Sequence, residues 1–552
     1  MIQAPSEGGR LAGFSDFINE LRRRRVVRAL LLWGVVAFAV LQVYEPVMHG
    51  LHLPEWTLSF VVIGLGLGFP VTVGLSWMFD LTLDGIERTP AAGAPGAAIA
   101  PTIAVLPFVN LSSDKEQEYF SDGIAEEILN SLAQLDGLRV IGRTSSFSMK
   151  GRNEDLRTIG QRLNAAYLLE GSVRKAGRRV RITSQLIEAA GGTHLWSQEF
   201  DRGLTDVFAV QEEIARAVVA ALQLKLLPAA RPAQRIVDPE AHDLYLRSQE
   251  FMRRGSAEDF SRAVETLQRA VERDPGYAMA WAALARARFW AADQGQVSEA
   301  TAEWSRALAE AEKAIGLDPA LSDGYLARGA LREFVSQDWT GARLDLERAR
   351  ALSPGSPIVQ MQVGSLLAGL GHLPEATAAL RKAAVLDPLS ADVQVLLAMV
   401  QLGSGWSPEA HAAAALAVEL APTHLRAART LGFSFLLQHR LPEARAAFHG
   451  AGNVFVGRLG DAMVDHALGD AGASQRALDL MLSDPSARRG SYQIAEVHAW
   501  RGDTDLAFDW LDRAVEARDG GLLYLKFDPL LEGLRRDARF AALLRRLDLP
   551  VE

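Results

Sequence analysis

Cysteine is absent from the 552 residues, and this absence excludes disulfide bonds, thiolate nucleophiles and zinc or iron–sulfur sites with cysteine ligands. It does not identify a compartment, because a chain without thiols is suited to reducing and oxidising surroundings alike. A concentration of positive charge is lacking as well: 58 basic and 67 acidic side chains are scattered along the chain, with a formal net charge of -9. Nucleic-acid binding, which needs a basic face, is therefore not expected.

Patterns that mark catalytic or metal sites are also lacking. The 11 histidines are dispersed and form no H-E-x-x-H or other close group of metal ligands. His194 stands alone at the start of an expected strand, where a structural role is the better interpretation. There is no G-x-S-x-G elbow, and Glu126 and Glu127 are sequence neighbours that point in different directions on a helix. The sequence therefore predicts a protein that is not an enzyme and that uses no metal and no cofactor.

Two long uncharged runs lie near the N-terminus, at residues 29–44 and 57–79. A membrane-spanning helix needs about 20 apolar residues, a length that the second run meets and that the first reaches only with residues 26–28. A signal peptide is the alternative for the first run, but no small-residue cleavage site follows it. We therefore predict two transmembrane helices, forming a helical hairpin, over residues 26–80.

The charges that flank these runs predict their orientation. Arginines at 22–25 and 28 precede the first run, whereas the loop 45–56 contains no Lys or Arg. The N-terminal segment, residues 1–25, is therefore expected in the cytoplasm, and two spans would return the rest of the chain to that side. A single span would place it in the periplasm instead. The sequence thus predicts a multi-pass protein of the bacterial inner (cytoplasmic) membrane, with soluble domains that are cytoplasmic rather than periplasmic.

Residues 81–101 are expected to form a linker, because their second half reads TPAAGAPGAAIAP and carries no charge. From 102 to 226, apolar strands alternate with amphipathic helices, which predicts a small α/β domain. Its last three strands should be antiparallel neighbours, since glycine-containing turns of hairpin length join them. The expected strands are 103–108, 138–141, 166–174, 179–188 and 194–200, and the expected helices are 121–135, 156–163 and 206–226.

The first strand, loop and helix of this domain have the order found in phosphate-binding sites. The loop 109–116, however, contains no glycine, and its one lysine, Lys115, is flanked by acidic residues. A phosphate loop needs glycines that expose backbone N–H groups and a lysine that meets the negative charge. We therefore expect a structural role here, with Ser121 or Asp122 as the N-cap of the helix.

Three stretches of the domain read IAVLPFVNLSSDKEQEYFSDGIAEEI (103–128), LRVIGRTSSF (138–147) and AAYLLEGSVRKAGRRVRITSQLIEAAGGTHLWSQEFDR (165–202). In content and order they resemble the TolB-like amino-terminal domain family of bacterial envelope proteins, which is related to flagellar FlgO-type domains. The resemblance implies a non-catalytic module that often follows a membrane anchor and precedes helical repeats. Some members of the family begin with a winged-helix DNA-binding domain or a nucleotide cyclase, and this chain is expected to have neither.

Residues 241–520 carry an internal repeat. Small residues and a proline recur at fixed offsets in the units Ala330-Ala342-Ala349-Pro354, Gly364-Ala376-Ala383-Pro388 and Ala398-Ala410-Ala417-Pro422, and the three prolines are 34 residues apart. The pattern resembles tetratricopeptide repeats, in which two antiparallel helices cross closely at small residues and a proline follows the second helix. It predicts an all-α superhelix of seven or eight helix pairs.

The flanks of the array and one stretch within it depart from this pattern. Residues 227–240 are expected to be a linker, and 521–552 to form capping helices with a polar face. Residues 457–487 keep the period only loosely, which predicts a kink or an altered repeat there.

A superhelix of this kind has an extended concave surface, and repeat geometry places one set of side chains on it. These candidate partner-binding residues are apolar with a basic edge, which suits an amphipathic helix or an extended peptide. The alternative is that they pack within a tight superhelix or against the α/β domain. The candidates are Leu331, Phe334, Met361, Val395, Met399, Leu402, Arg426, Arg429, Phe433 and Leu436.

The sequence as a whole therefore predicts three parts: a transmembrane helical hairpin, a small α/β domain of TolB-like type, and an all-α tetratricopeptide superhelix. The function it indicates is a membrane-anchored scaffold that recruits a protein or peptide partner through the superhelix. The alternative is a sensory or regulatory component that transmits a ligand or partner signal to a separate output subunit.

Overall fold

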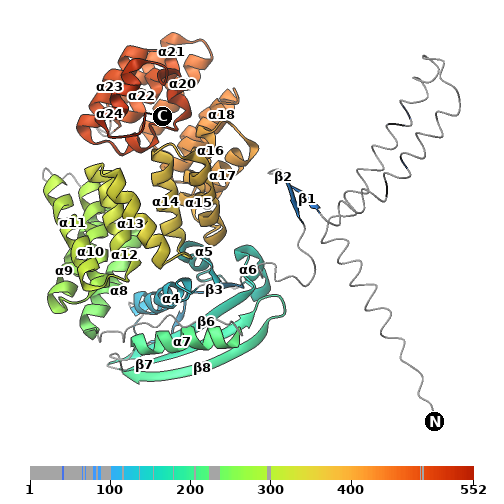
Figure 1. Ribbon diagram of the computed structural model, residues 1–552, viewed down its shortest axis with the longest axis vertical. Coiled ribbons are helices and arrows are strands. Elements are labelled where there is room, and N and C mark those ends of the chain that lie inside the picture. Colours follow the sequence, from blue (N-terminus) through green and yellow to red (C-terminus); the bar gives the residue numbers. More distant parts are fainter. Residues whose placement is uncertain are drawn as a thin grey trace. The chain divides into compact units, whose positions relative to one another are not determined.

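The computed structural model describes residues 101–112, 114, 117–135, 137–152, 154–177, 179–203, 207–222, 237–294, 300–484, 487 and 490–551, with residues 40, 42, 65, 69, 79–82 and 85–88. They belong to two units, 1–99 and 100–552. Figure 1 shows the helices and strands, most of them labelled.

In the first unit, two short strands, β1 (Phe79–Thr82) and β2 (Gly85–Arg88), form an antiparallel pair. Among the described residues, no helix has the length and apolar character needed to cross a bilayer, so the predicted transmembrane hairpin is wrong. The segment for which it was predicted, 26–80, lies almost entirely outside the described residues, as does the whole of 1–25. The predicted membrane location depended on that hairpin, and no described residue tests it.

The second unit begins with a six-stranded sheet of order β5-β3-β6-β7-β8, in which β4 also pairs with β6. Strand β3 is parallel to both β5 and β6, whereas β6, β7 and β8 are antiparallel neighbours, which confirms the prediction from their turns. The strands are β3 (Thr102–Val105), β4 (Val109–Asn110), β5 (Arg139–Val140), β6 (Tyr167–Ala176), β7 (Arg179–Glu188) and β8 (Thr193–Gly203). The helices are α4 (Glu118–Ala133), α5 (Arg143–Phe147), α6 (Leu156–Leu163) and α7 (Val207–Ala221).

The two faces of this sheet are covered unequally. Because side chains alternate along a strand, Val180, Ile182 and Leu186 of β7 share one face, where they join a core with α4 and α7. On the other face, Leu168 of β6 packs with Ile159 and other residues of α6 and its surroundings. Helix α6 has only 8 residues, so it covers only a part of this second face.

The N-cap predicted for the first helix of the domain is wrong. Helix α4 begins at Glu118, its N-cap is Gln117, and no side chain caps it. Ser121 and Asp122 lie buried within the helix. Asp122 instead forms ion pairs with Lys150 at 2.7 Å and with Arg253 at 3.2 Å, partners that are distant in sequence and that local patterns do not indicate.

Residues 239–517 form a superhelix of eight antiparallel helix pairs in the described part of the chain (Figure 1). The pairs are α8 (Pro239–Arg254) with α9 (Ala257–Arg273), α10 (Ala278–Gln294) with α11 (Ala300–Leu317), α12 (Ser322–Leu331) with α13 (Trp339–Leu352), α14 (Pro357–Gly369) with α15 (Leu373–Leu386), α16 (Ala391–Gly403) with α17 (Pro408–Leu420), α18 (Leu425–Leu436) with α19 (Leu441–Gly450), α20 (Val454–Ala467) with α21 (Ala471–Leu482), and α22 (Ser491–Arg501) with α23 (Thr504–Ala517). A π-helical turn, η3 (Arg332–Ser336), extends α12.

The predicted repeat positions explain how the helices pack. A Cβ added at Gly364 would lie 2.6 Å from Leu380 Cγ, so only glycine allows α14 and α15 to cross so closely. The N-terminal caps of the helices also follow the repeat. Ser356 and Ser390 each lie two residues after a repeat proline, and each side chain accepts a hydrogen bond from the backbone N–H of the third residue that follows it. Tetratricopeptide-type phasing is therefore confirmed. The stretch 457–487, for which a kink or altered repeat was predicted, contains a regular pair, α20 and α21.

The α/β domain and the array pack together within the second unit. His242 of α8 lies 2.8 Å from the Glu127 carboxylate of α4, and the Ser145 backbone N–H donates to Asp387 between α15 and α16 at 2.7 Å. One core cluster also includes residues of α4, α7, α8 and α10. Of the predicted linker 227–240, the described residues begin at Val237, and Asp238 caps α8.

The chain ends in η5 (Gly520–Tyr524), η6 (Pro529–Leu534) and α24 (Ala538–Arg546). We call residues 519–549 the C-terminal segment. It does more than cover the last repeat, because its apolar side chains belong to a core cluster that joins Leu346 of the third pair with Leu511 of the last. The segment therefore runs back toward the middle of the array.

Candidate functional site

The candidate surface is formed by α12, α14, α16, α18 and α22, the first helices of their pairs, and we call it the groove. Seven of the ten predicted residues are buried in it: Leu331, Val395, Met399, Leu402, Arg429, Phe433 and Leu436. Phe334 and Met361 are half-buried, and Arg426 is exposed. The structure thus brings most of these side chains into the interior, as in the alternative that they pack within the superhelix, and partner binding by them stays a prediction.

The C-terminal segment covers the middle of the groove. A Cβ added at Gly403, at the end of α16, would lie 2.1 Å from the Phe527 backbone oxygen, and one at Gly369 of α14 would lie 3.5 Å from the Leu523 oxygen. Phe527 itself is 1% exposed and belongs to the same apolar cluster as Met399 and Phe433. A segment of the chain therefore occupies the place that the sequence analysis gave to a partner.

Side-chain hydrogen bonds to backbone oxygens hold the middle and the end of this segment. Lys526 Nζ donates to the Leu370 carbonyl oxygen at 3.1 Å and to the Pro550 carbonyl oxygen at 2.8 Å. Trp339 Nε1 donates to the Leu547 carbonyl oxygen at 2.7 Å, which links α13 to a residue 208 positions later. The Trp339–Leu547 hydrogen bond is buried, so it satisfies two polar groups that would otherwise lack partners.

Ionisable groups meet beneath the centre of the segment. Arg429 of α18 lies 3.6 Å from Glu496 of α22, and both side chains are buried. Asp528 is fully buried and accepts a hydrogen bond from the Tyr492 hydroxyl at 3.0 Å. Burial raises the pKa of the Glu496 carboxyl well above its usual range; Arg429 opposes the rise, and the neighbouring Asp528 carboxylate adds to it. Of these groups, Tyr492 links the array directly to Asp528 of the segment, and leaving a buried polar group without its partner costs about 1–3 kcal/mol.

The basic edge predicted for the groove is only partly exposed. Arg426 donates to the Asp392 carboxylate at 2.5 Å and also hydrogen-bonds Tyr524 of the C-terminal segment. The hydrogen bond from His424 and the charge of Arg426 outweigh burial and lower the pKa of Asp392 to about 2. Asp392 is therefore ionised at neutral pH and balances the arginine.

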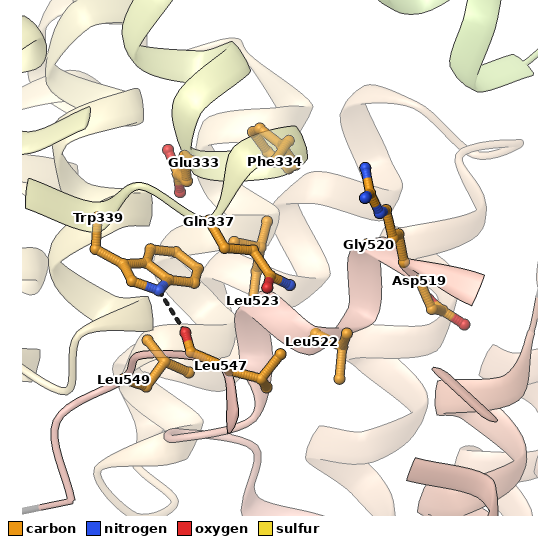
Figure 2. Close-up of a pocket in the computed structure, with 11 residues that line it drawn as sticks. Glu333, Phe334, Gln337, Trp339, Asp519, Gly520, Leu522, Leu523, Leu547 and Leu549 are labelled. Atoms are coloured by element: carbon orange, nitrogen blue, oxygen red, sulfur yellow. Dashed lines mark hydrogen bonds between the residues drawn. The ribbon is translucent and has the colours of Figure 1, made fainter. Parts of the chain in front are cut away.

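A small cavity of about 20 Å³ remains where the segment meets η3, with room for about one water molecule (Figure 2). Figure 2 shows Glu333, Phe334 and Gln337 on one side of it, and Leu522, Leu523 and Leu547 of the C-terminal segment on the other. Glu333 accepts hydrogen bonds from Gln362 at 2.6 Å and Ser365 at 3.2 Å. Burial raises the pKa of Glu333 to about 8, although these hydrogen bonds oppose the rise.

The sequence analysis missed the residues that hold the segment, namely Trp339, Tyr492, Glu496 and Asp528. Tyr492 and Glu496 lie on α22, where a repeat period identifies small residues but not their polar neighbours. One signal was available for the segment: residues 522–531 read LLYLKFDPLL, which is too apolar for a cap that faces water on one side.

Comparison with protein families finds a match at residues 99–217, to the second domain of HilA/YgeH-like transcriptional regulators. This region is the α/β domain. The TolB-like resemblance was drawn on the same residues, and it stays an expectation.

A curated relative is "Putative adenylate cyclase 3" of Rhizobium meliloti (strain 1021), 46% identical over 193 residues, which are 34% of this chain and 33% of that protein. The chain thus spans about a third of the relative's length. Solved structures that are similar include a thermophilic TPR protein of Thermus thermophilus (22% identity, 36% of this chain and 95% of that chain, TM-score 0.27) and Pseudomonas aeruginosa pilF (16%, 41% and 99%, TM-score 0.33).

Proposed function

We propose that this protein is an interaction scaffold that binds a protein partner in the groove of its superhelix, in exchange for its own C-terminal segment. The observation that supports the proposal is the occupied groove. A short peptide-like segment with two 3-10 turns already lies across α14, α16 and α22, with Phe527 and Asp528 almost wholly buried. A surface that binds one such segment within the chain has the shape and chemistry to bind another from outside it.

The occupant indicates the chemistry of the partner. Tyr524 to Leu531 reads YLKFDPLL, in which the Phe527 ring, the Asp528 carboxylate and three leucines are the buried elements. Tyr492 binds the carboxylate, and Met399 and Phe433 belong to the apolar cluster around the ring. A partner segment should therefore carry an aromatic residue followed by an acidic residue and aliphatic side chains.

Competition with the C-terminal segment also weakens the partner's apparent affinity for the groove. A groove that its own segment fills most of the time has an apparent dissociation constant equal to the intrinsic one divided by the open fraction. The tethered segment competes at a high effective concentration, commonly in the millimolar range for short connections. A change that loosens the C-terminal segment should thus strengthen partner binding without touching the partner's own contacts.

The test separates the segment from the array without removing it. A protease recognition sequence is inserted between Arg518 and Asp519 of the full chain, at an exposed turn after α23. After cleavage, labelled synthetic peptide 519–552 is added and its exchange into the groove is followed by fluorescence anisotropy. We expect the peptide to bind the cleaved chain, and the peptide with Phe527→Ala to bind at least about tenfold more weakly, because a large buried ring is lost.

The matched control peptide carries Glu532→Gln, since Glu532 is exposed on the same segment. It should bind like the unmodified peptide. Proteins that bind the cleaved chain, and that peptide 519–552 displaces, would be partners of the groove. Aggregation of the cleaved chain without rebinding would show that the segment is only part of the fold, and partners that bind intact and cleaved chains equally would place the binding surface elsewhere.

A second candidate function is a regulatory component that acts on a separate output subunit. Two findings favour it: the α/β domain matches a domain of transcriptional regulators, and a partial relative is named as an adenylate cyclase. The absence of an enzymatic activity in this chain stays a prediction. The test is to purify the full chain with its bound proteins and to measure whether an associated enzyme or DNA-binding activity changes when peptide 519–552 is added. An associated activity that never changes would contradict this second function.

A further inference from the structure

A cleft of about 730 Å³ lies in the α/β domain, far along the chain from the groove residues. It opens on the second face of the sheet, beside α6 and the loop that follows β3. Strand β3 pairs with β5 on one side and with β6 on the other, so successive connections leave it in opposite directions. Ligands of parallel α/β sheets bind outside the carboxyl ends of the strands at such a point, and pockets of this volume suit small molecules.

Four polar side chains form one wall of the cleft. In the register of β6 and β7, Glu170 is opposite Gln185 and Ser172 is opposite Thr183, and all four point to the second face of the sheet. All four are half-buried. Within the residues that the structure describes, none of them makes a side-chain hydrogen bond or an ion pair. The wall therefore offers acceptors and donors that the protein itself does not use.

The charges around the cleft leave one carboxylate uncompensated. Lys150 forms ion pairs with Glu118 at 2.8 Å and Asp122 at 2.7 Å. Glu154, which also lines the cleft, lies 3.4 Å from Arg152 and 2.9 Å from Arg162. Among the described residues that line the cleft, Glu170 is the acidic one that has no such partner. A half-buried carboxylate in this setting favours a cation that donates hydrogen bonds.

The floor of the cleft has a different character. Leu106, Met149, Leu156 and Ile159 line it, and they belong to or pack against the apolar cluster beneath α6. A ligand that used both the wall and the floor would need a charged donor at one end and an apolar body at the other. Inorganic cations and fully polar molecules do not meet the second requirement.

We propose that this cleft binds a small organic amine, with its ammonium group on Glu170 and its apolar body over Leu106, Met149 and Ile159. Gln185 and Thr183 stand next to Glu170 and supply further acceptors for the ammonium hydrogens. Ser145, which precedes the lining residue Met149 in sequence, donates to Asp387 of the array, so the domain contacts the superhelix close along the chain to the cleft. The site does not depend on the groove function proposed above.

The experiment measures binding of phenethylamine and hexylamine to the full chain by saturation-transfer NMR and calorimetry. The uncharged 2-phenylethanol is the matched probe that lacks the ammonium group. We expect millimolar or tighter binding of both amines, at least about tenfold stronger than that of the alcohol, since hydrogen bonds to charged groups are the stronger ones. No binding of either amine at about 10 mM, or equal binding of the alcohol, would overturn the proposal.

Two variants locate the amine. Glu170→Gln should weaken amine binding about tenfold or more and leave binding of the alcohol unchanged. Its control is Glu188→Gln, which removes the same charge from an exposed position of β7 that does not line the cleft. Equal losses in both variants would show non-specific charge attraction and would overturn the assignment.

A third variant keeps the test valid if Glu170→Gln does not fold. Gln185→Lys places an ammonium group directly across the strands from Glu170, where an opposite-charge pair is stabilising. This variant should fold at least as well as the unmodified protein. It should lose amine binding, because the ammonium group introduced at position 185 pairs with the Glu170 carboxylate in place of the amine. Amine binding that persists in a folded Gln185→Lys protein would overturn the proposal.

Discussion

At the scale of single residues, buried carboxyl groups collect where the array meets its C-terminal segment. Glu333 is 1% exposed, and Glu496 and Asp528 are fully buried. Taking a carboxylate out of water costs several kcal/mol unless partners replace the water. Glu496 has Arg429 beside it, whereas the hydrogen-bond partners of Glu333, Gln362 and Ser365, carry no charge. Glu333 therefore keeps its proton at neutral pH. Its raised pKa reflects burial without the contribution of an ion pair.

Glu333 predicts a loss of stability as the pH rises. Its pKa is about 8 in the folded chain, against an ordinary value of 4.5. Below the ordinary value both states hold the proton. Between the two values the unfolded chain releases it and the folded chain does not, so the free energy of unfolding falls with pH, by about 1.4 kcal/mol for each pKa unit. Above pH 8 this loss is complete.

The measurement is urea unfolding of the full chain and of Glu333→Gln between pH 5 and pH 9. The variant keeps an oxygen that accepts from Gln362 but has no proton to lose, so its stability should fall less over this range, by a few kcal/mol. All other carboxyl groups are common to both proteins, and the difference between the two curves isolates Glu333. Parallel curves would show that Glu333 is ionised in the folded state.

At the scale of helices, the close approach of paired helices depends on glycine. A Cβ added at Gly432 of α18 would lie 2.5 Å from the Phe448 ring of α19, and Phe448 is fully buried. Such a distance requires the ring or the helices to shift. Overpacking of a filled core by a single methyl group typically costs about 1–3 kcal/mol.

We therefore expect Gly432→Ala to lower the stability of the array by about 1–3 kcal/mol, although alanine favours helix more than glycine does. The matched control is Gly450→Ala at the end of α19, where an added Cβ meets nothing within 4 Å. That change should leave stability unchanged or raise it by up to about 1 kcal/mol. Thermal and urea unfolding measure both variants, and equal effects would contradict the packing explanation.

The sequence predicted the helix pairs because their pattern is local. A small residue, its partner on the next helix and the following proline lie within one repeat, so Gly364, Ala383 and Pro388 could be assigned without long-range information. The same reasoning could not find η3, in which Glu333 is buried. A π-helical turn has no distinctive residue composition by which the sequence would indicate it. Nor could this reasoning place the N-cap of α4, because Asp122 is bound by Lys150 and Arg253.

The groove shows the limit of local patterns most clearly. Repeat geometry correctly assigned Met399 and Phe433 to neighbouring first helices, and both join one apolar cluster. The local pattern could not show what buries them, because Phe527, which is packed into that cluster, comes from a non-repeating segment about a hundred residues later. A period describes how repeats meet each other, and it says nothing about a segment outside the repeats.

At the scale of the whole second unit, the α/β domain and the start of the array share one core. The cluster includes Ile128 of α4, Leu244 and Leu246 of α8, and Ala283 of α10. Leu246 is 2% exposed, and its side chain lies against Gly123, where an added Cβ would be 2.6 Å from Leu246 Cδ2. Residues that share one close-packed core open together, so sheet and first repeats should form one cooperative region.

This shared core predicts that a change in α8 is felt in the sheet. Leu246→Ala should cost about 2–5 kcal/mol, as for other buried leucines, and should speed amide hydrogen exchange in α4 and β6 as much as in α8. The control is Leu506→Ala in α23, where the side chain is 48% exposed, and it should leave exchange in the sheet unchanged. Hydrogen exchange with mass spectrometry reports each segment separately. Faster exchange confined to α8 and α9 would show that the α/β domain opens independently, and a ligand bound in its cleft would then have no packed route to the superhelix.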